Sequence, residues 1–220
     1  MNNYFGMMMV REGEADGLIS GLTQHYPDTV RPALQIIGHR DDTSVVAGLY
    51  MLIFKNQIIF IADATINIEP NTEQLAQIAM LTAEKVRKYD IEPNIAMLSF
   101  SNFGSVHHPL AEKVRAAVEI VKKKMPNLNI DGEMQADTAV TPEILSEIYP
   151  FSSLKSGANV LICPDLTSSN IAYKLLARLG GATAVGPILM GIRKPVYLLI
   201  PGNDVSDIVN ITAMAVQDAQ

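Results

Sequence analysis

Short apolar runs rich in β-branched and aromatic residues alternate with stretches of helical periodicity along most of this 220-residue sequence. Such alternation predicts an α/β fold, in which crossover helices link the strands of a largely parallel sheet. The predicted strands cover residues 7–10, 45–54, 57–63, 94–100, 159–163 and 196–200. Only Lys55 and Asn56 separate the second strand from the third, and so short a gap predicts a hairpin.

Apolar residues at helical spacing predict four helices, over residues 72–89, 109–125, 167–179 and from about 204 almost to the end. End signals support these helices. Asn71 or Thr72 would cap the first helix, and Thr167 would cap the third. Pro109 opens the second, where a first-turn proline is tolerated.

Charge and composition exclude several classes of protein. The chain has 17 basic and 23 acidic residues and no basic stripe, so we expect neither nucleic acid nor an anionic membrane surface as a partner. No apolar run is long enough to span a bilayer, and we expect no signal peptide. The single cysteine, Cys163, forms no internal disulfide and suits a reducing, cytoplasmic location.

Polar side chains follow several predicted strands where ligands bind in α/β sheets, at the carboxyl ends. Residues 99–108, 164–170 and 200–207 are therefore candidate walls of a site. The loop SFSNFGS leads into a helix, and its backbone N–H groups and the helix dipole favour an anion such as phosphate. An ordinary strand-to-helix loop remains the alternative. No G-x-G-x-x-G or Walker sequence supports nucleotide binding.

Other polar residues keep two interpretations. His107 and His108 are adjacent and lack metal-ligand spacing, which favours surface or capping roles. Lys174 either binds phosphate or is a solvated surface residue. Asp207 lies in a first helical turn, where the dipole alone stabilises a carboxylate. Arg31 either pairs locally or reaches an acidic ligand.

Six segments together are similar to the phosphate acetyltransferase (phosphotransacetylase) family, in order and over nearly the whole chain. They read YFGMMMV, DTVRPALQII, EPNIAMLSFSNFGS, IDGEMQADTAV, PDLTSSNIAYK and GPILMGIRKPV. The resemblance implies transfer of an acetyl group between coenzyme A and phosphate, without a metal. It also implies a three-layer αβα, isopropylmalate-dehydrogenase-like fold of two lobes with the active site between them.

Two stretches, SFSNFGSVHHP and IVNITAMAVQDAQ, most resemble the C-terminal phosphotransacetylase-like domain of bacterial NADP-dependent malic enzymes. This resemblance implies a non-catalytic, acetyl-CoA-binding domain for regulation and oligomerisation. Malate would be oxidatively decarboxylated by a separate malic-enzyme module, where NADP and a divalent metal are expected. This chain itself would need no cofactor, with acetyl-CoA as its effector. An active phosphate acetyltransferase and a purely structural oligomerisation module are the alternatives.

The resemblance also assigns roles to individual residues. Asp207 occupies the position of the family's base. Ile200 and Pro201 replace the family's Ser-Arg pair and offer neither a cation nor a side-chain donor. Loss of a pre-organised donor commonly lowers a rate by a factor on the order of 10²–10³. Positions expected to contact acetyl-CoA or acetyl phosphate are Arg31, Ser99, Ser101, Asn102, Gly104, Ser105, Asn170, Tyr173, Lys174 and Gly186.

The same resemblance predicts how the chain divides. Residues 1–36 and 188–220 would be a remnant of an N-terminally truncated first lobe, and residues 37–187 the second lobe. We expect a homodimer formed through the second lobe. Missing strands would also leave a sheet edge open, and an open edge favours pairing with another chain.

Overall fold

The computed structural model describes residues 2–220, and its internal contacts divide the chain into two compact units. The first unit takes in the chain as far as Gly48 together with Val185–Gln220, and the second unit is Leu49–Ala184. Within residues 2–220, no helix is long and apolar enough to cross a membrane. The lobe boundaries expected from the family resemblance stay a prediction.

The second unit is built on five strands in the order β2-β3-β6-β4-β5. Their bounds are β2 (Ala47–Ile53), β3 (Ile58–Ala62), β6 (Val160–Ile162), β4 (Asn94–Leu98) and β5 (Asn129–Met134). β2 and β3 form the expected antiparallel hairpin, while β3, β6, β4 and β5 pair in parallel. The carboxyl ends of these four parallel strands therefore share one edge of the sheet.

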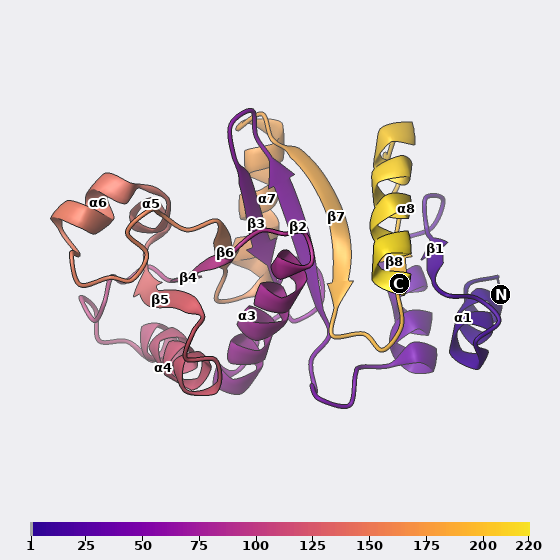
Figure 1. Cartoon of the computed structure of the whole chain (residues 1–220), viewed down its shortest axis with the longest axis horizontal. Helices are drawn as coiled ribbons and strands as arrows, with labels where there is room; N and C mark the ends of the chain where they lie inside the picture. The colour runs from indigo at the N-terminus through magenta and orange to yellow at the C-terminus, as the bar shows by residue number, and fades with distance from the viewer. Residues whose placement is uncertain (1) are drawn as a thin grey trace. The chain divides into compact units, whose positions relative to one another are not determined.

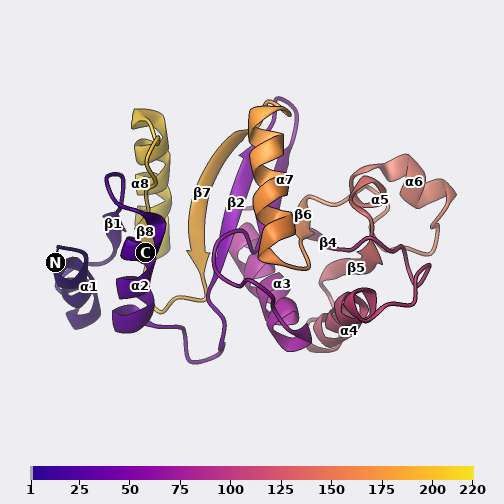
Figure 2. The same ribbon diagram turned by 180° about the vertical axis from the view of Figure 1, so that it is seen from behind.

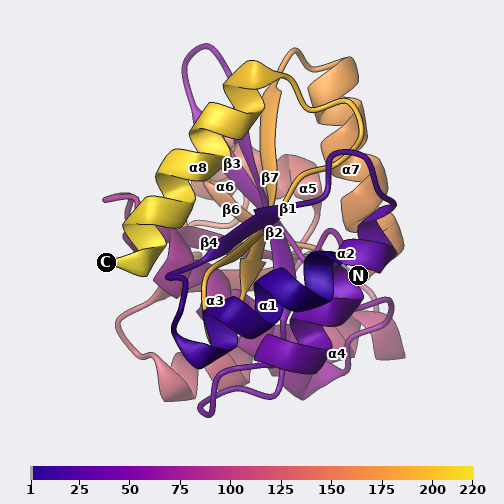
Figure 3. The same cartoon turned by 90° about the vertical axis from the view of Figure 1, so that its right-hand side faces the viewer.

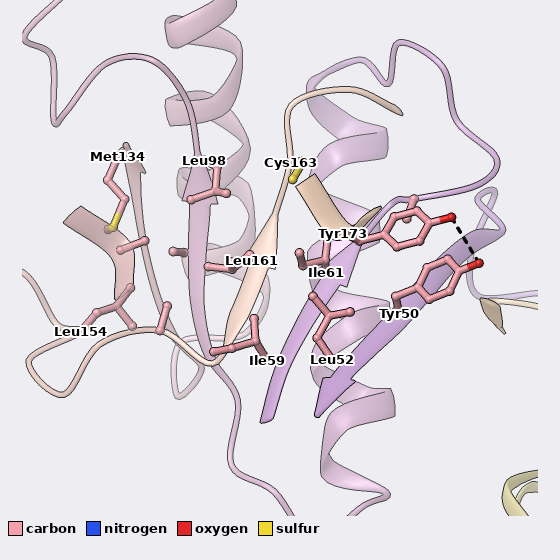
Figure 4. Close-up of a cluster of buried hydrophobic side chains, with 14 of the residues drawn as sticks. Tyr50, Leu52, Ile59, Ile61, Leu98, Met134, Leu154, Leu161, Cys163 and Tyr173 are labelled. Carbon is pink, nitrogen blue, oxygen red and sulfur yellow. Dashed lines mark hydrogen bonds between the residues drawn. The ribbon is translucent and has the colours of Figure 1, made fainter. Parts of the chain in front are cut away.

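Helices cover both faces of this sheet, giving a three-layer α/β arrangement. α3 (Thr72–Arg87) and α4 (Pro109–Lys124) pack against each other on one face, and α7 (Leu166–Arg178) covers the other (Figures 1 and 2). Two short helices, α5 (Ala136–Val140) and α6 (Pro142–Glu147), follow β5. Side chains between the α7 face and the strands form a buried apolar cluster that includes Ile61, Leu161 and Cys163 (Figure 4).

The first unit has three strands in the order β1-β8-β7. They are β1 (Leu18–Ser20), β8 (Val196–Leu198) and β7 (Thr183–Met190), and the helical segments are α1 (Asn2–Glu12), α2 (Tyr26–Pro32), the π-helix η1 (Ala33–Ile37) and α8 (Val205–Ala219). α8 lies on one side of β1 and α1 and α2 on the other (Figure 3).

Most of the predicted elements are confirmed within one to three residues at each end, including the capping of α3 by Asn71. The strand predicted at residues 7–10 is wrong, because this run lies inside α1. Asn3, Met7 and Val10 are the buried residues of α1, and their spacings of four and three are helical. Four apolar residues in a row are too few to distinguish a strand from a helix. The predicted cap of α7 is also wrong, because Asp165 rather than Thr167 accepts the N-terminal hydrogen bond.

β5 was not predicted, because its sequence NIDGEM hides the apolar pattern of a buried strand. Asp131 and Glu133 are both buried within it. The pairing with β4 shifts register there: Met97 pairs with Gly132, and Leu98 pairs with Met134. Glu133 is thus the extra residue of a β-bulge, a feature that redirects a side chain and is common beside functional sites.

Candidate functional site

The loop after β4, residues 99–106, folds back on itself through its own hydroxyl groups. The Ser105 hydroxyl accepts a hydrogen bond from the Asn102 N–H (2.9 Å), and the Ser101 hydroxyl accepts one from the Val106 N–H (3.1 Å). The Ser101 and Ser105 hydroxyls lie 3.2 Å apart, within hydrogen-bond distance. Hydroxyl side chains that bond to nearby backbone groups stabilise compact turns of this kind.

Backbone N–H groups across this loop are occupied by partners within the protein. The N–H of Phe103 donates to the backbone oxygen of Glu133, and that of Gly104 donates to the Glu133 carboxylate, both at 2.8 Å. The Ser105 N–H donates to the Asn102 carbonyl oxygen at 2.9 Å. The expectation that these backbone groups hold an anion is therefore wrong for residues 102–106, because none of their N–H groups is left for a ligand.

Side chains are therefore the donors that this loop offers a ligand. Asn102 Oδ1 accepts the Gln135 N–H at 2.8 Å, which fixes the orientation of the amide and leaves Nδ2 as the group facing away from this bond. Within residues 2–220, neither Asn102 Nδ2 nor the Ser99 hydroxyl has a hydrogen-bond partner, and both residues are partly exposed. Ser99 follows β4 directly, and its N–H donates to the Met134 oxygen.

A buried ion pair that the sequence analysis missed supports the loop. The Glu133 carboxylate has no exposed surface, and it accepts hydrogen bonds from the Ser101 hydroxyl and the Gly104 N–H. Arg115 on α4 binds it through two nitrogens, at 2.9 and 3.0 Å. Burial raises the pKa of the Glu133 carboxyl, but the donors of Arg115, Gly104 and Ser101 outweigh that effect and hold the pKa below its usual value. The sequence feature that could have revealed Glu133 is an acidic residue next to a glycine in the segment DGEM.

The segment before α7 lies at the same edge of the sheet, at the carboxyl end of β6. Asp165 caps α7 by accepting the Ser168 N–H at 2.7 Å. Lys113 of α4 donates to the carbonyl oxygens of Pro164 (3.0 Å) and Pro70 (3.1 Å), so it joins two loops at this edge. His108 caps α4 through its ring Nδ1, which confirms the capping role that was considered for it.

The predicted ligand residues of α7 lie in different environments. Asn170 Nδ2 donates to the Ala64 oxygen at 3.4 Å, at the carboxyl end of β3. Tyr173 is buried, and its ring stacks on Tyr50 with the centroids 4.0 Å apart (Figure 4). Lys174 is exposed, with its ammonium 5.8 Å from the centre of the Tyr173 ring. Tyr173 thus has a packing role in the core, and ligand contact by these three residues stays a prediction.

Asp207 belongs to the first unit, where it forms a capping box at the start of α8. Its carboxylate accepts the Asp204 N–H (3.0 Å) and the Asn203 side-chain amide (2.9 Å), while its own N–H donates to the Asp204 carboxylate. The preceding residues Ile200–Asn203 form a tight turn, in which Ile200 and Asn203 are hydrogen-bonded to each other. Pro201 and Gly202, with φ +100°, suit the two central positions of such a turn.

The other two predicted ligand residues of the first unit, Arg31 and Gly186, lie far from this turn in the sequence. Arg31 is exposed in the last turn of α2, and Gly186 is buried in β7. A hollow of about 530 Å³ in this unit is lined by Asp16, Gly17, Ile19, Thr212, Ala215, Val216, Ala219 and Gln220, and none of these is a predicted site residue. In the part of the chain that the structure describes, no group of three or more His, Cys, Asp or Glu side chains could hold a metal ion.

An α/β chain with a hydroxyl- and amide-bearing loop at the carboxyl ends of its strands suits the binding of small anionic ligands. The family model described as phosphate acetyl/butaryl transferase matches residues 1–216, so the chain belongs to this family. A phosphotransacetylase from Streptococcus pyogenes shares the fold, with a TM-score of 0.94 and 44% sequence identity over 99% of this chain and 67% of that one.

Two kinds of curated relative are matched almost equally well. The phosphate acetyltransferase of Bacillus subtilis (strain 168) is 43% identical over 217 residues, which are 99% of this chain and 67% of that protein. The NADP-dependent malic enzyme of Escherichia coli (strain K12) is 41% identical over 216 residues, 98% of this chain but only 28% of that protein. The chain thus corresponds to part of each relative.

Proposed function

We propose that the chain binds acetyl phosphate or acetyl-CoA at the loop of residues 99–105. The observation that carries the proposal is the free Asn102 amide, held as a donor by the bond from the Gln135 N–H to its oxygen. An N–H donor on the same loop as the Ser99 hydroxyl suits a phosphoryl or acyl oxygen. Membership of the phosphate acetyl/butaryl transferase family supports this ligand class.

The reaction proposed on this basis is acetyl transfer between coenzyme A and phosphate, which the phosphate acetyltransferase relatives support most directly. The sulfur of coenzyme A attacks the carbonyl carbon of acetyl phosphate and forms a C–S bond. The bond between that carbon and the bridging phosphate oxygen breaks, and phosphate leaves. The thiol proton passes to a base, for which Asp207 is the candidate. The Asp207 carboxylate accepts hydrogen bonds from the Asn203 side-chain amide and the Asp204 N–H, and these two bonds fix its orientation at the start of α8.

A second candidate is a sensor that binds acetyl-CoA without transferring the acetyl group. The turn at Ile200 and Pro201 favours it, because neither side chain can stabilise charge developing on the acyl oxygen. The match to part of a malic enzyme also favours it. Under this proposal a malic-enzyme module, with its NADP and divalent metal, is the partner within a longer chain. Dimerisation through the second lobe and a cytoplasmic location stay predictions.

A transfer assay distinguishes the two candidates. Acetyl-CoA formation from acetyl phosphate and coenzyme A is measured for the wild type, Asp207→Ala and Asp204→Ala. The two variants each remove one side chain of the same capping box, so they should lose similar stability. Transfer that is abolished only by Asp207→Ala supports the enzyme, whereas binding of acetyl-CoA without turnover supports the sensor. The absence of both binding and turnover would contradict the proposed function.

A further inference from the structure

The bulge in β5 directs Glu133 at the loop after β4. Glu133 has no pairing partner on β4, whereas the flanking residues Gly132 and Met134 do. Gly132 is required for this geometry, because its φ is +135° and a Cβ there would lie 2.6 Å from the Met97 oxygen. The local backbone is thus specialised to present this one carboxylate.

Glu133 contacts the loop at three residues. Its Oε1 accepts from Ser101 and Gly104, and its backbone oxygen accepts from Phe103. Asn102 lies between these anchored residues, with its own oxygen bonded to the Gln135 N–H. The direction of the free Asn102 amide therefore depends on the anchors on both sides of it.

We propose that Glu133 is a positioning residue that holds the loop so that Asn102 presents its amide to the acyl or phosphoryl oxygen of the ligand. Arg115 keeps the buried carboxylate ionised by its two-nitrogen contact. The inference rests on the proposed function, since it assumes that this loop binds acetyl-CoA or acetyl phosphate. Glu133 and Arg115 thereby join the site as residues that affect the ligand only through the position of Asn102.

The chain provides a matched control on the same strand. Asp131 is also buried in β5 and also pairs with a cation of α4, because Lys122 Nζ lies 3.1 Å from its carboxylate. Its Oδ2 accepts from the Ser152 hydroxyl and the Ser153 N–H, which belong to a different segment. Its Oδ1 also accepts from the Gly132 N–H at 3.1 Å, and Asn keeps an oxygen for that bond. Asp131→Asn therefore disturbs a comparable buried ion pair without disturbing the loop.

The experiment compares wild type, Asp131→Asn, Glu133→Met and the double variant Glu133→Gln with Arg115→Met. Glu133→Met removes the acceptor for Ser101 and Gly104, and the exposed part of Arg115 lets the guanidinium turn to solvent. In the double variant, the side-chain oxygen of the new glutamine can still accept from the loop. Its N–H₂ group would face the N–H donors of Arg115, and Arg115→Met removes that conflict. Acetyl-CoA affinity is measured by calorimetry, and amide exchange is measured over residues 102–106.

We expect Glu133→Met to weaken acetyl-CoA binding at least about tenfold, because the Ser101 hydroxyl and the Gly104 N–H lose the acceptor that holds the loop. The double variant should bind within about threefold of wild type, because the acceptor is retained. Asp131→Asn should bind like wild type even if its melting temperature falls. Affinity that follows the acceptor and not the melting temperature distinguishes positioning from general stability.

Two results would overturn the inference. One is unchanged affinity in Glu133→Met, and the other is a double variant as weak as Glu133→Met, because charge rather than the acceptor would then matter. If wild type binds no acetyl-CoA, the proposed function fails and amide exchange alone decides whether Glu133 positions the loop. Faster exchange of residues 102–106 in Glu133→Met but not in Asp131→Asn supports the positioning role, and equal exchange contradicts it.

Discussion

The buried Glu133 carboxylate makes stability depend on pH. Its pKa is lowered in the folded chain, so its contribution is present above the unfolded value of about 4.3 and is lost as the pH falls toward the folded value. Glu133→Gln should therefore be less stable than wild type at pH 7, and the difference should narrow between pH 5 and pH 3.5, roughly one unit on either side of the unfolded value. Urea denaturation at several pH values measures this. A difference that stays constant with pH would contradict the assignment.

Gly104 is the residue of the loop least able to accept a side chain. Its φ is +87°, and a Cβ there would lie 3.4 Å from Arg115 Nη2. Gly104→Ala should lose about 1 kcal/mol of unfolding free energy from backbone strain and should also weaken acetyl-CoA binding. Gly181→Ala is the control, because Gly181 has a φ of +73° with nothing within 4 Å of the added carbon. The prediction is wrong if the two variants bind acetyl-CoA equally well.

At the scale of elements, predictions from the sequence were reliable where the local signal was long or chemically specific. α3 was found from its apolar spacing and its cap, and the structure shows a complete capping box between Asn71 and Gln74. β5 and α1 were missed because buried acids interrupt the first and a short methionine run dominates the second. The site was predicted only in part for the same reason: the loop was visible, but Glu133 lies in the missed strand.

The capping box of α3 gives a prediction at this scale. Asn71→Ala removes the acceptor for the Gln74 N–H and should lower the unfolding free energy by about 1 kcal/mol. Acetyl-CoA binding should not change, because this cap lies outside the loop. Thermal or urea unfolding measures the effect, and Thr72→Ala next to it is the control. Equal stability of the two variants would show that the cap contributes nothing.

For the whole molecule, the family resemblance read from six segments is confirmed by the family match over residues 1–216. The α/β class and the hairpin of β2 and β3 are confirmed as well, and the four strands β3, β6, β4 and β5 pair in parallel. The expectation of a single hairpin is wrong, because the consecutive strands β7 and β8 also pair antiparallel. What the sequence could not supply was the direction of hydrogen bonds within the loop. Three of the backbone N–H groups that looked available for an anion donate to Ser101, Asn102 and Ser105 of the same loop. The other two, of Phe103 and Gly104, donate to Glu133 of β5, which is distant in sequence.

The central claim is that the Asn102 amide is a donor to the bound acetyl ligand, and Asn102→Asp tests it most directly. Asp keeps the oxygen that accepts the Gln135 N–H but replaces the free N–H₂ by a second, negatively charged oxygen. Calorimetric titration with acetyl-CoA should show saturable binding to wild type and at least about tenfold weaker binding to the variant, with little change in melting temperature. Equal affinity of the two proteins would contradict the account.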